Sequence, residues 1–359
     1  MTPLELYHAL IAEPREAGTP GAERARALLT EHLTSRGYDV LEQRFVFQPA
    51  VLNAFPLLGA GLGWLTLLEI PLLLLAGLPG GLAPLVWFAG ALALGLLAWG
   101  IGTGVEVPGA ERREDANLIV TRGLAPVRRW IVAHVDTKAQ GHSMAGRLVA
   151  VWALLATALA LSLLTPWRAV RGDALPGWAV GAAAGLSVAA GLLASRGRLR
   201  GQTVGARDNG TGLLAALTAA EEGPGEGVGY LFTGAEEFGL VGARALQRAG
   251  HAAACDVINL DTITDRGRLY LVAHDRRGLA LAEALRPSLS AGGEGPRVRR
   301  LPVGILTDSL PFARSGRPAV TVSRLDWSDL RRLHTPQDTG EDLGLETAVR
   351  VGRALAGLR

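Results

Sequence analysis

The chain has 359 residues, enough for one α/β domain of about 270 residues together with additional segments. Its net charge is only +3, and its arginines occur in short groups without interleaved aromatic residues, which argues against a nucleic-acid-binding protein. The single cysteine, Cys255, excludes an internal disulfide, while 49% hydrophobic residues and a mean hydropathy of +0.25 indicate a chain too apolar for an ordinary soluble protein.

Residues 1–50 are expected to begin the main domain. Leu6 and Leu10 recur at helical spacing, and a second amphipathic helix is predicted around Leu29 and Leu33, after the helix-breaking sequence GTPG. The alternating sequence YDVLEQRFVF then predicts a first strand, and ANLIVTRG predicts a second. Charged residues from position 5 onward are untypical of a secretory signal peptide, so none is expected.

A long apolar stretch follows, in which Glu69 is the only charged residue between positions 51 and 105. Val51–Leu78 and Leu82–Val105 are each long enough, as helices, to span about 30 Å of hydrocarbon. The sequence GLPGG at residues 77–81 supplies a turn between them. This stretch therefore predicts a transmembrane helical hairpin at 51–105.

A second apolar stretch predicts another hairpin at 148–195. Leu148–Trp167 and Ala174–Ser195 carry no charged residue, and the polar sequence RAVRGD lies between them. The protein is therefore predicted to be a multi-pass membrane protein with four spans. The main domain would be assembled from the remaining segments, 1–50, 106–147 and 196–359.

The ends of both hairpins return to the main domain, so that domain is expected to lie on one face of the lipid bilayer. Arginine is more frequent at the domain side of the hairpins, at positions 112, 113, 147, 196, 198 and 200, than at the far side, which has only Arg168 and Arg171. Under the positive-inside rule, this bias predicts a cytoplasmic main domain.

Glycines within the predicted spans favour close helix packing. Gly59 and Gly63 have the small-residue spacing that lets helices approach each other, and so do Gly181 and Gly185. Glu69 is expected to face other helices or water, because a carboxylate that faces lipid is energetically expensive.

The main domain carries five residues of metal-binding type. His134 and Asp261 lie near the ends of short apolar runs that predict buried strands, RWIVAH and DVINLD, and Glu237 follows a similar run, GYLFT. Asp208 lies in the sequence RDNGTG, at the predicted start of a helix, and His334 lies in LHTPQD. Carboxyl ends of strands in an open α/β sheet are where binding sites are usually built.

Two imidazoles and three carboxylates suit zinc and leave coordination positions open for water, as a hydrolase requires. Asp208 could bridge two ions roughly 3.5–4 Å apart. Glu236, beside Glu237, is then free to act as a general base, and Asp136 could orient the His134 imidazole. Each residue alone would more commonly be a surface residue or a helix cap, so this prediction depends on their joint occurrence.

The motifs of the main domain resemble those of the co-catalytic zinc aminopeptidases, the family that includes bacterial leucyl aminopeptidase and aminopeptidase S and has glutaminyl cyclases as wider relatives. Six sequence blocks carry the resemblance, in the family's order: His134–Asp136, Asp208–Gly212, Glu236 and Glu237 with the following GLVG, Asn259–Asp261, Thr307–Phe312 and His334–Asp338. The resemblance covers the chain apart from the apolar insertions.

This resemblance implies a mixed, mostly parallel central sheet flanked by helices, and two Zn²⁺ ions. One ion would be held by His134 and Asp261 and the other by Glu237 and His334, with Asp208 bridging them and Glu236 as general base. The implied activity is hydrolysis of the amino-terminal residue of a peptide. Ser309 stands where relatives often carry histidine, which concerns substrate preference, and the neighbouring Asp308 is a candidate for substrate binding.

Two other functions are compatible with the same scaffold. One is a glutaminyl-cyclase-like acyltransferase with a single zinc ion, and the intact DNGTG sequence favours the two-metal peptidase over it. The other is a non-catalytic membrane scaffold, although such proteins usually lose metal ligands that are all present here. Carboxypeptidase or dipeptidase action, the native metal, the preferred residue and the oligomeric state are left open.

Overall fold

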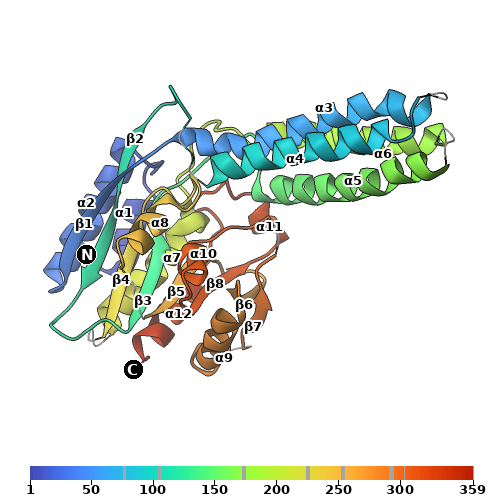
Figure 1. Cartoon of the computed structure of the whole chain (residues 1–359). Helices are drawn as coiled ribbons and strands as arrows, with labels where there is room; N and C mark the ends of the chain where they lie inside the picture. Colours follow the sequence, from blue (N-terminus) through green and yellow to red (C-terminus); the bar gives the residue numbers. More distant parts are fainter. Residues whose placement is uncertain are drawn as a thin grey trace. The chain divides into compact units, whose positions relative to one another are not determined.

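Figure 1 shows the computed structural model of the chain, which describes residues 1–75, 78–103, 105, 107–171, 175–223, 227–251, 255–290, 295–302 and 304–358. The chain divides into two compact units. The first comprises Met1–Phe47, Arg112–Ala139 and Gly201–Arg359, and the second comprises Gln48–Glu111 and Gln140–Arg200. The second unit therefore contains the segments predicted as hairpins. Some positions of those predictions lie outside the described residues: Ala76 and Gly77 at the first turn, Gly104 in the second span, Gly172 and Asp173 in RAVRGD, and Ala174 at the start of the last span.

The first unit is built on an eight-stranded sheet with the order β1-β2-β4-β3-β5-β8-β6-β7. The four adjacent strands β4, β3, β5 and β8 are parallel, while β1, β2 and β6 pair antiparallel with a neighbour. This arrangement confirms the predicted mixed, mostly parallel α/β sheet. The strands are β1 (Asp39–Phe47), β2 (Arg113–Thr121), β3 (Arg129–His134), β4 (Val228–Thr233), β5 (Asp256–Ile263), β6 (Arg268–Ala273), β7 (Arg297–Arg300) and β8 (Ala319–Leu325).

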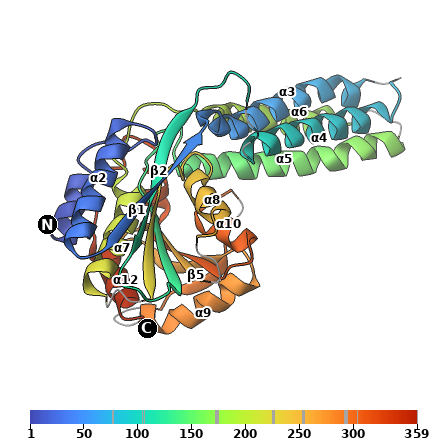
Figure 2. The same cartoon turned by 60° about the vertical axis from the view of Figure 1, so that its left-hand side comes forward.

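Helices cover both faces of this sheet. Successive residues of a strand point to opposite faces, so a strand whose residues are all buried must be packed on both sides. In β3, Ile131 and Ala133 pack in the core that includes residues of α1, α2, α7, α9 and α12, whereas Trp130 and Val132 pack with α8 and α10 (Figure 2). The helices are α1 (Pro3–Leu10), α2 (Pro20–Ser35), α7 (Gly212–Glu222), α8 (Val241–Arg248), α9 (Arg276–Ser290), α10 (Ser309–Arg314), α11 (Trp327–Leu330) and α12 (Glu346–Ala356).

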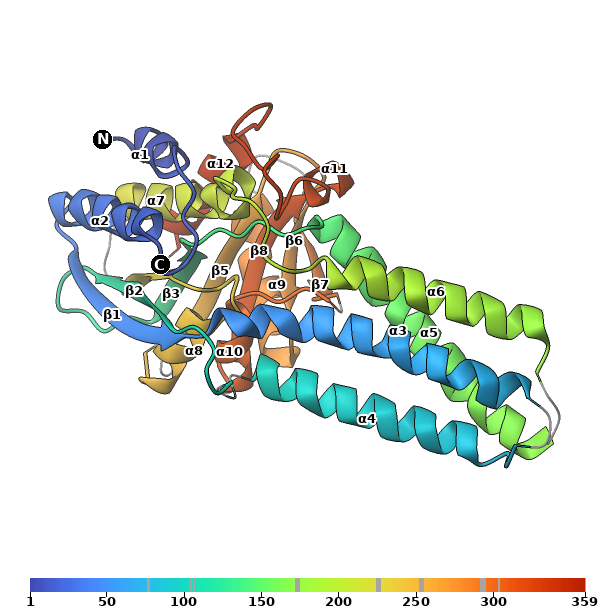
Figure 3. The same ribbon diagram turned by 90° about the horizontal axis from the view of Figure 1, so that it is seen from above.

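The second unit is a bundle of four long helices (Figure 3). They are α3 (Ala54–Leu74), which follows a 3-10 helix at Pro49–Asn53, α4 (Leu82–Gly102), α5 (Met144–Arg171) and α6 (Gly177–Ser195). All four are long and apolar enough to cross a membrane. The third predicted span was too short at its end, because α5 continues through Arg168 to Arg171, and Arg168 is buried and donates a hydrogen bond to the carbonyl of Leu75.

Polarity in this bundle is inverted relative to a water-soluble protein. Large apolar side chains such as Trp64, Leu92 and Trp178 are exposed, whereas polar groups face the interior. The Thr66 and Ser187 hydroxyls share a hydrogen bond of 2.6 Å, and Glu69 is fully buried, in agreement with its predicted orientation away from lipid. Exposed apolar surface on this scale has a favourable environment in hydrocarbon rather than in water.

The glycines of the bundle have different surroundings. A Cβ atom on Gly59 would lie 2.2 Å from the Cβ of Ala194, so α3 and α6 approach closely at this point, as the sequence indicated. Among the described residues, no other group lies within 4 Å of the Cβ positions of Gly181 and Gly185, so these two glycines form no close helix contact with that part of the chain, contrary to what their spacing favoured.

Candidate metal centre

The five candidate ligands come from chain segments that meet at the carboxyl end of the parallel strands. His134 is the last residue of β3, Asp261 lies near the end of β5, and Glu237 follows β4. Asp208 belongs to an irregular turn, Ala206–Thr211, that leads into α7, and His334 lies in the segment between α11 and α12. Because these strands are parallel, their carboxyl ends lie at the same edge of the sheet.

The ligand atoms form two groups that share one residue. His134, Asp208 and Asp261 bring one ligand atom each within 4.8 Å of the others, and so do Asp208, Glu237 and His334. The His134 Nε2 atom lies 3.1 Å from one carboxylate oxygen of Asp208, and the His334 Nε2 atom lies 3.2 Å from the other. Asp208 therefore presents a different oxygen to each group.

These separations fit metal ions. Two donor atoms that each lie about 2.0 Å from one tetrahedral ion are roughly 3.3 Å apart. Glu237 Oε1 lies 3.3 Å from His334 Nε2 and forms no hydrogen bond with any residue that the structure describes, so both atoms are oriented towards the same point. The His134 Nδ1 atom lies 3.0 Å from the main-chain oxygen of Asp136, which leaves Nε2 as the ligand atom.

The electrostatics also indicate that positive charge is required here. Burial raises the pKa of Asp261 to about 7, and burial together with nearby acidic groups raises the pKa of Glu236 well above its usual range. A cluster of buried carboxylates can ionise fully only when cations compensate it. Divalent ions in the two groups would supply that compensation.

The backbone around the ligands is strained. Ala235, Thr262 and His334 all adopt positive φ angles, of 49°, 52° and 63°. Such conformations are unfavourable for residues other than glycine and persist where the surrounding structure enforces them, often at functional sites. Here they occur immediately before Glu236, immediately after Asp261 and at His334 itself. The Asp208–Asn209 peptide bond is cis.

Side chains of the DNGTG sequence attach the Asp208 turn to β5. The Asn209 amide donates to the carbonyl of Leu260 over 2.8 Å and accepts from the main-chain N–H groups of Gly212 and Thr262. The Thr211 hydroxyl accepts from the N–H of Ile263 over 2.8 Å. This connection fixes the position of Asp208 relative to Asp261.

Asp136 has a different contact from the one predicted. Its carboxylate lies 3.8 Å from His134 Nδ1, beyond hydrogen-bonding distance, and it is the main-chain oxygen that contacts the imidazole. The carboxylate instead accepts hydrogen bonds from the N–H groups of Glu236, at 3.0 Å, and Glu237, at 3.1 Å. Asp136 thus orients both members of the glutamate pair, because the tight loop after β4 turns their amides towards it.

Two buried arginines, which the sequence analysis did not identify, support the ligand segments. Arg15 is fully buried and donates to the carbonyls of Val135 and Val204, and also to those of Leu10 and Gly205. Arg207 pairs with Asp329, and also with Asp338, whose carboxylate accepts the N–H groups of Arg207 and Asp208. Asp338 could be identified from its place in the sequence block His334–Asp338, but nothing in the local sequence distinguishes Arg15 from a surface arginine.

Asp308 and Ser309 lie side by side with different partners. One oxygen of Asp308 accepts a hydrogen bond from Thr233, and the other is buried with no hydrogen-bond partner among the described residues. The Ser309 hydroxyl forms a hydrogen bond of 3.1 Å with His274 Nε2, and it lies 2.8 Å from the Thr321 hydroxyl. His274, a histidine outside the candidate ligand set, thus belongs to a partly buried polar network beside Asp308.

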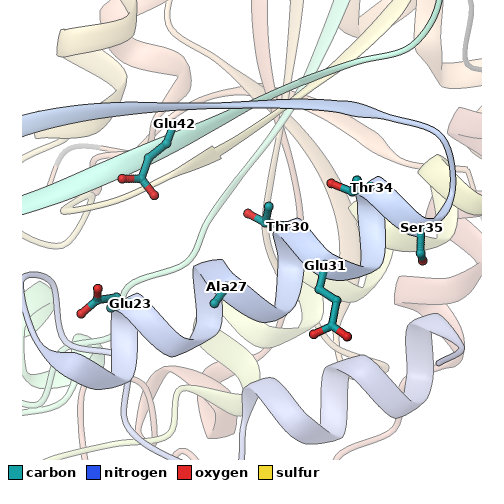
Figure 4. A pocket seen from close by; sticks show the side chains of 7 residues that line it. All are labelled: Glu23, Ala27, Thr30, Glu31, Thr34, Ser35 and Glu42. Atoms are coloured by element: carbon teal, nitrogen blue, oxygen red, sulfur yellow. The ribbon is translucent and has the colours of Figure 1, made fainter.

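A groove elsewhere in the first unit has no such features. It lies between α2 and β1 and is lined by Glu23, Ala27, Thr30, Glu31, Thr34, Ser35 and Glu42 (Figure 4). None of its glutamates belongs to a metal-type cluster of the described residues. Exposed acidic side chains of this kind are ordinarily solvated, so the groove is not part of the site.

Comparison with known proteins agrees with this geometry. Residues 186–358 match the sequence model of Peptidase family M28. The match indicates a Peptidase family M28 domain within these residues, which make up slightly less than half of the chain. The matched range includes Asp208, Glu237, Asp261 and His334, and His134 precedes it. Peptidases of this family generally bind zinc. No curated protein sequence matches the chain significantly.

Solved structures show the same fold. An aminopeptidase from Aneurinibacillus sp. strain AM-1 is 14% identical, with a TM-score of 0.56 over 99% of this chain and 91% of that one. A leucine aminopeptidase precursor from Bacteroides thetaiotaomicron is 13% identical, with a TM-score of 0.56 over 99% and 94%. A glutaminyl cyclase from Porphyromonas gingivalis is 16% identical, with a TM-score of 0.56 over 99% and 95%. The similarity to both aminopeptidases and a glutaminyl cyclase establishes the fold, but it does not distinguish between their reactions.

Proposed function

We propose that this protein is a membrane-anchored metallo-aminopeptidase that holds two zinc ions. The observation that carries this proposal is the position of Asp208, whose two oxygens belong to two separate groups of ligand atoms. A carboxylate shared in this way is the arrangement that a two-metal hydrolase requires. Peptidase family membership and aminopeptidase structures among the neighbours support hydrolysis of peptides.

In this proposal, His134 and Asp261 bind one ion, Glu237 and His334 bind the other, and Asp208 binds both. Bound ions of this type supply Lewis acidity, which polarises the scissile carbonyl and makes water a stronger acid. Hydrolysis also requires a group of the protein that transfers a proton from the attacking water to the leaving amine.

Glu236 is the proposed general base. Its electrostatic environment includes His134, Glu237, Asp308 and Asp261, so it lies among the ligands, yet it is not needed in either ligand group. The burial that raises its pKa gives its carboxylate the proton affinity that a base requires. Glu236 takes a proton from the attacking water and delivers it to the amine that leaves as the peptide bond breaks.

Asp308 is proposed to bind the free amino group of the peptide. Its second carboxylate oxygen is buried and has no hydrogen-bond donor within the described part of the chain. An unpartnered buried acceptor is costly, and a substrate ammonium would satisfy it. This contact would select peptides by their amino-terminal end.

Membrane anchoring is supported by the inverted bundle. Besides its exposed leucines, the bundle exposes Trp99 and Trp152 near one end of the helices and Trp167 and Trp178 near the other. Tryptophan is enriched at both interfaces of a membrane, where its ring contacts the headgroup region. The proposed partners are thus a lipid bilayer and a peptide substrate, with the catalytic domain on the cytoplasmic side.

The proposal is tested on the purified full-length protein in detergent. We expect release of fluorophores from aminoacyl substrates, loss of this activity on treatment with a chelator, recovery on addition of zinc, and two metal ions per chain. Cleavage of amino-terminally blocked peptides instead would contradict aminopeptidase action.

The same assay distinguishes the second candidate, a glutaminyl cyclase, which is favoured by the glutaminyl cyclases among the structural neighbours. One metal ion per chain with cyclisation of amino-terminal glutamine and no fluorophore release would establish that reaction. Metal binding without turnover of either substrate class would indicate a non-catalytic scaffold.

A further inference from the structure

We propose that Lys138 positions Glu237 as a metal ligand through a single oxygen atom, so that the metal position formed with His334 depends on Lys138 and the position formed with His134 does not. This inference rests on the two-metal site proposed above. It adds to that site a residue outside the ligand set.

Lys138 is a buried lysine with a specific partner. Its side chain is only 2% exposed, and its Nζ atom lies 2.7 Å from Glu237 Oε2 and donates to the main-chain carbonyl of Glu237 over 3.3 Å. A buried ammonium group is costly unless it is paired and hydrogen-bonded. Among the described residues, both of its polar contacts are made to the same residue, and together they fix the carboxylate relative to its own main chain.

The pairing divides the two oxygens of Glu237 between two tasks. Oε2 is occupied by Lys138, and Oε1 remains without a hydrogen bond, 3.3 Å from His334 Nε2. If the carboxylate rotated, Oε1 would move away from His334 and from Asp208. Lys138 therefore holds the orientation in which one oxygen completes the ligand group.

The other ligand group has a different support. Asp261 accepts a hydrogen bond from the hydroxyl of Thr262 over 3.1 Å, and His134 contacts the main-chain oxygen of Asp136. No contact between Lys138 and this group occurs among the described residues. The two metal positions consequently differ in their dependence on this one side chain.

A simpler role for Lys138 would be to neutralise the buried acidic residues. The two roles predict opposite effects of a neutral substitution. If Lys138 only supplied charge, its ammonium would repel the ion held by Glu237 and His334, and its removal would tighten that ion. If Lys138 positions Glu237, its removal weakens the same ion, as is typical when a residue that orients a metal ligand is lost.

The test is zinc binding by the metal-free, full-length protein in detergent, followed by equilibrium dialysis and metal analysis. For Lys138→Met, we expect one ion to retain its wild-type affinity and the second to bind roughly 10–100-fold more weakly. The control is Arg26→Met, which removes a partly buried ion pair of the same unit, with Asp115, and should leave both zinc affinities unchanged. Thermal unfolding of the metal-free proteins verifies that both variants fold.

Should Lys138→Met fail to fold, Lys138→Gln provides the same comparison, because glutamine is neutral but can still donate to Glu237. For Lys138→Gln, we expect the second ion to bind roughly 3–10-fold more weakly than in the wild-type protein. In either variant, an unchanged or tighter second ion would overturn the inference. A wild-type protein that binds fewer than two ions would instead refute the proposed two-metal function, whatever the variants do.

Discussion

Glu236 and Glu237 are neighbours in the chain, but the site gives their carboxylates opposite surroundings. Burial raises the pKa of Glu237, but His334 and Lys138 outweigh it and hold that pKa well below its ordinary value. For Glu236, burial and the neighbouring carboxylates outweigh His134, so its pKa is raised. Adjacent acids with pKa values pushed apart are typical of a site in which one is a permanent anion and the other transfers protons.

Glu236→Gln is expected to lower hydrolytic turnover by a factor of roughly 10²–10⁴, because the amide cannot accept a proton from water. Metal content should stay at the wild-type value, since Glu236 belongs to neither ligand group. Turnover of an aminoacyl substrate, measured beside metal analysis of the same sample, checks both parts. Wild-type turnover would show that another group acts as the base.

Asp136→Asn is expected to reduce activity by about 10–100-fold, the usual effect of changing a residue that orients the catalytic groups. The asparagine can accept one of the two amide N–H groups of Glu236 and Glu237, but its own NH₂ group faces the other. Steady-state kinetics should show the loss mainly in kcat. An unchanged kcat would mean that the backbone of the glutamate pair is held without this carboxylate.

At the scale of elements, the turn that carries Asp208 is attached to neighbouring segments by side chains that are not ligands. The Asp208 turn is bonded to β5 through Asn209 and Thr211, and to the segment after α11 through Asp338. The parallel strands bring the segments to one edge, and these bonds set the ligand positions within it. In the bundle, the close packing of α3 against α6 fixes the positions of these two helices relative to each other.

Gly59→Leu is expected to destabilise the bundle by about 1–3 kcal/mol, because the new side chain would collide with Ala194 of α6. Gly185→Leu is a matched control, since its Cβ position is open and the leucine would extend outward from the bundle. Thermal unfolding in detergent compares the two variants. Equal stability of the two would contradict the close α3–α6 contact.

At the scale of the whole molecule, the chain leaves the first unit for the helical bundle twice, and returns twice, before all five candidate metal ligands have been supplied. His134 lies in the segment Arg112–Ala139, between the two visits to the bundle, and the other four ligands lie in Gly201–Arg359. The centre can therefore form only after both hairpins have been synthesised. If the hairpins cross a membrane as proposed, an insertion of this kind would also place both ends of each hairpin on the same side of it.

Arginine bias predicts that the far end of the bundle is extracytoplasmic. In a protein carrying Cys255→Ser, a cysteine at Arg171, an exposed position at the end of α5, should react with a membrane-impermeant maleimide in intact cells. A cysteine at Glu283, an exposed position on α9, should react only after permeabilisation. The reverse pattern would place the catalytic domain outside.

The sequence alone determined the properties that depend on residue type and local period. Long uncharged runs specify apolar helices wherever they fold, and the ligand-rich motifs could be recognised because their chemistry is carried by each residue itself. The α/β class, which the structure confirms, and the five candidate ligands, which it brings together, were accessible in this way. Arg168 shows where local patterns fail, since its charge suggested a turn and its burial depends on a contact with the opposite hairpin.

Only the tertiary structure decided how the parts interact. It showed that Asp208 divides its oxygens between the two groups, and that the Asp136 carboxylate contacts the glutamate pair rather than His134. It also showed that Arg15 and Lys138 are buried against the segments that carry the ligands. These properties depend on contacts between residues that are far apart in the chain. A charged side chain has no local signal that distinguishes burial against such partners from exposure to water, so only the assembled fold reveals its role.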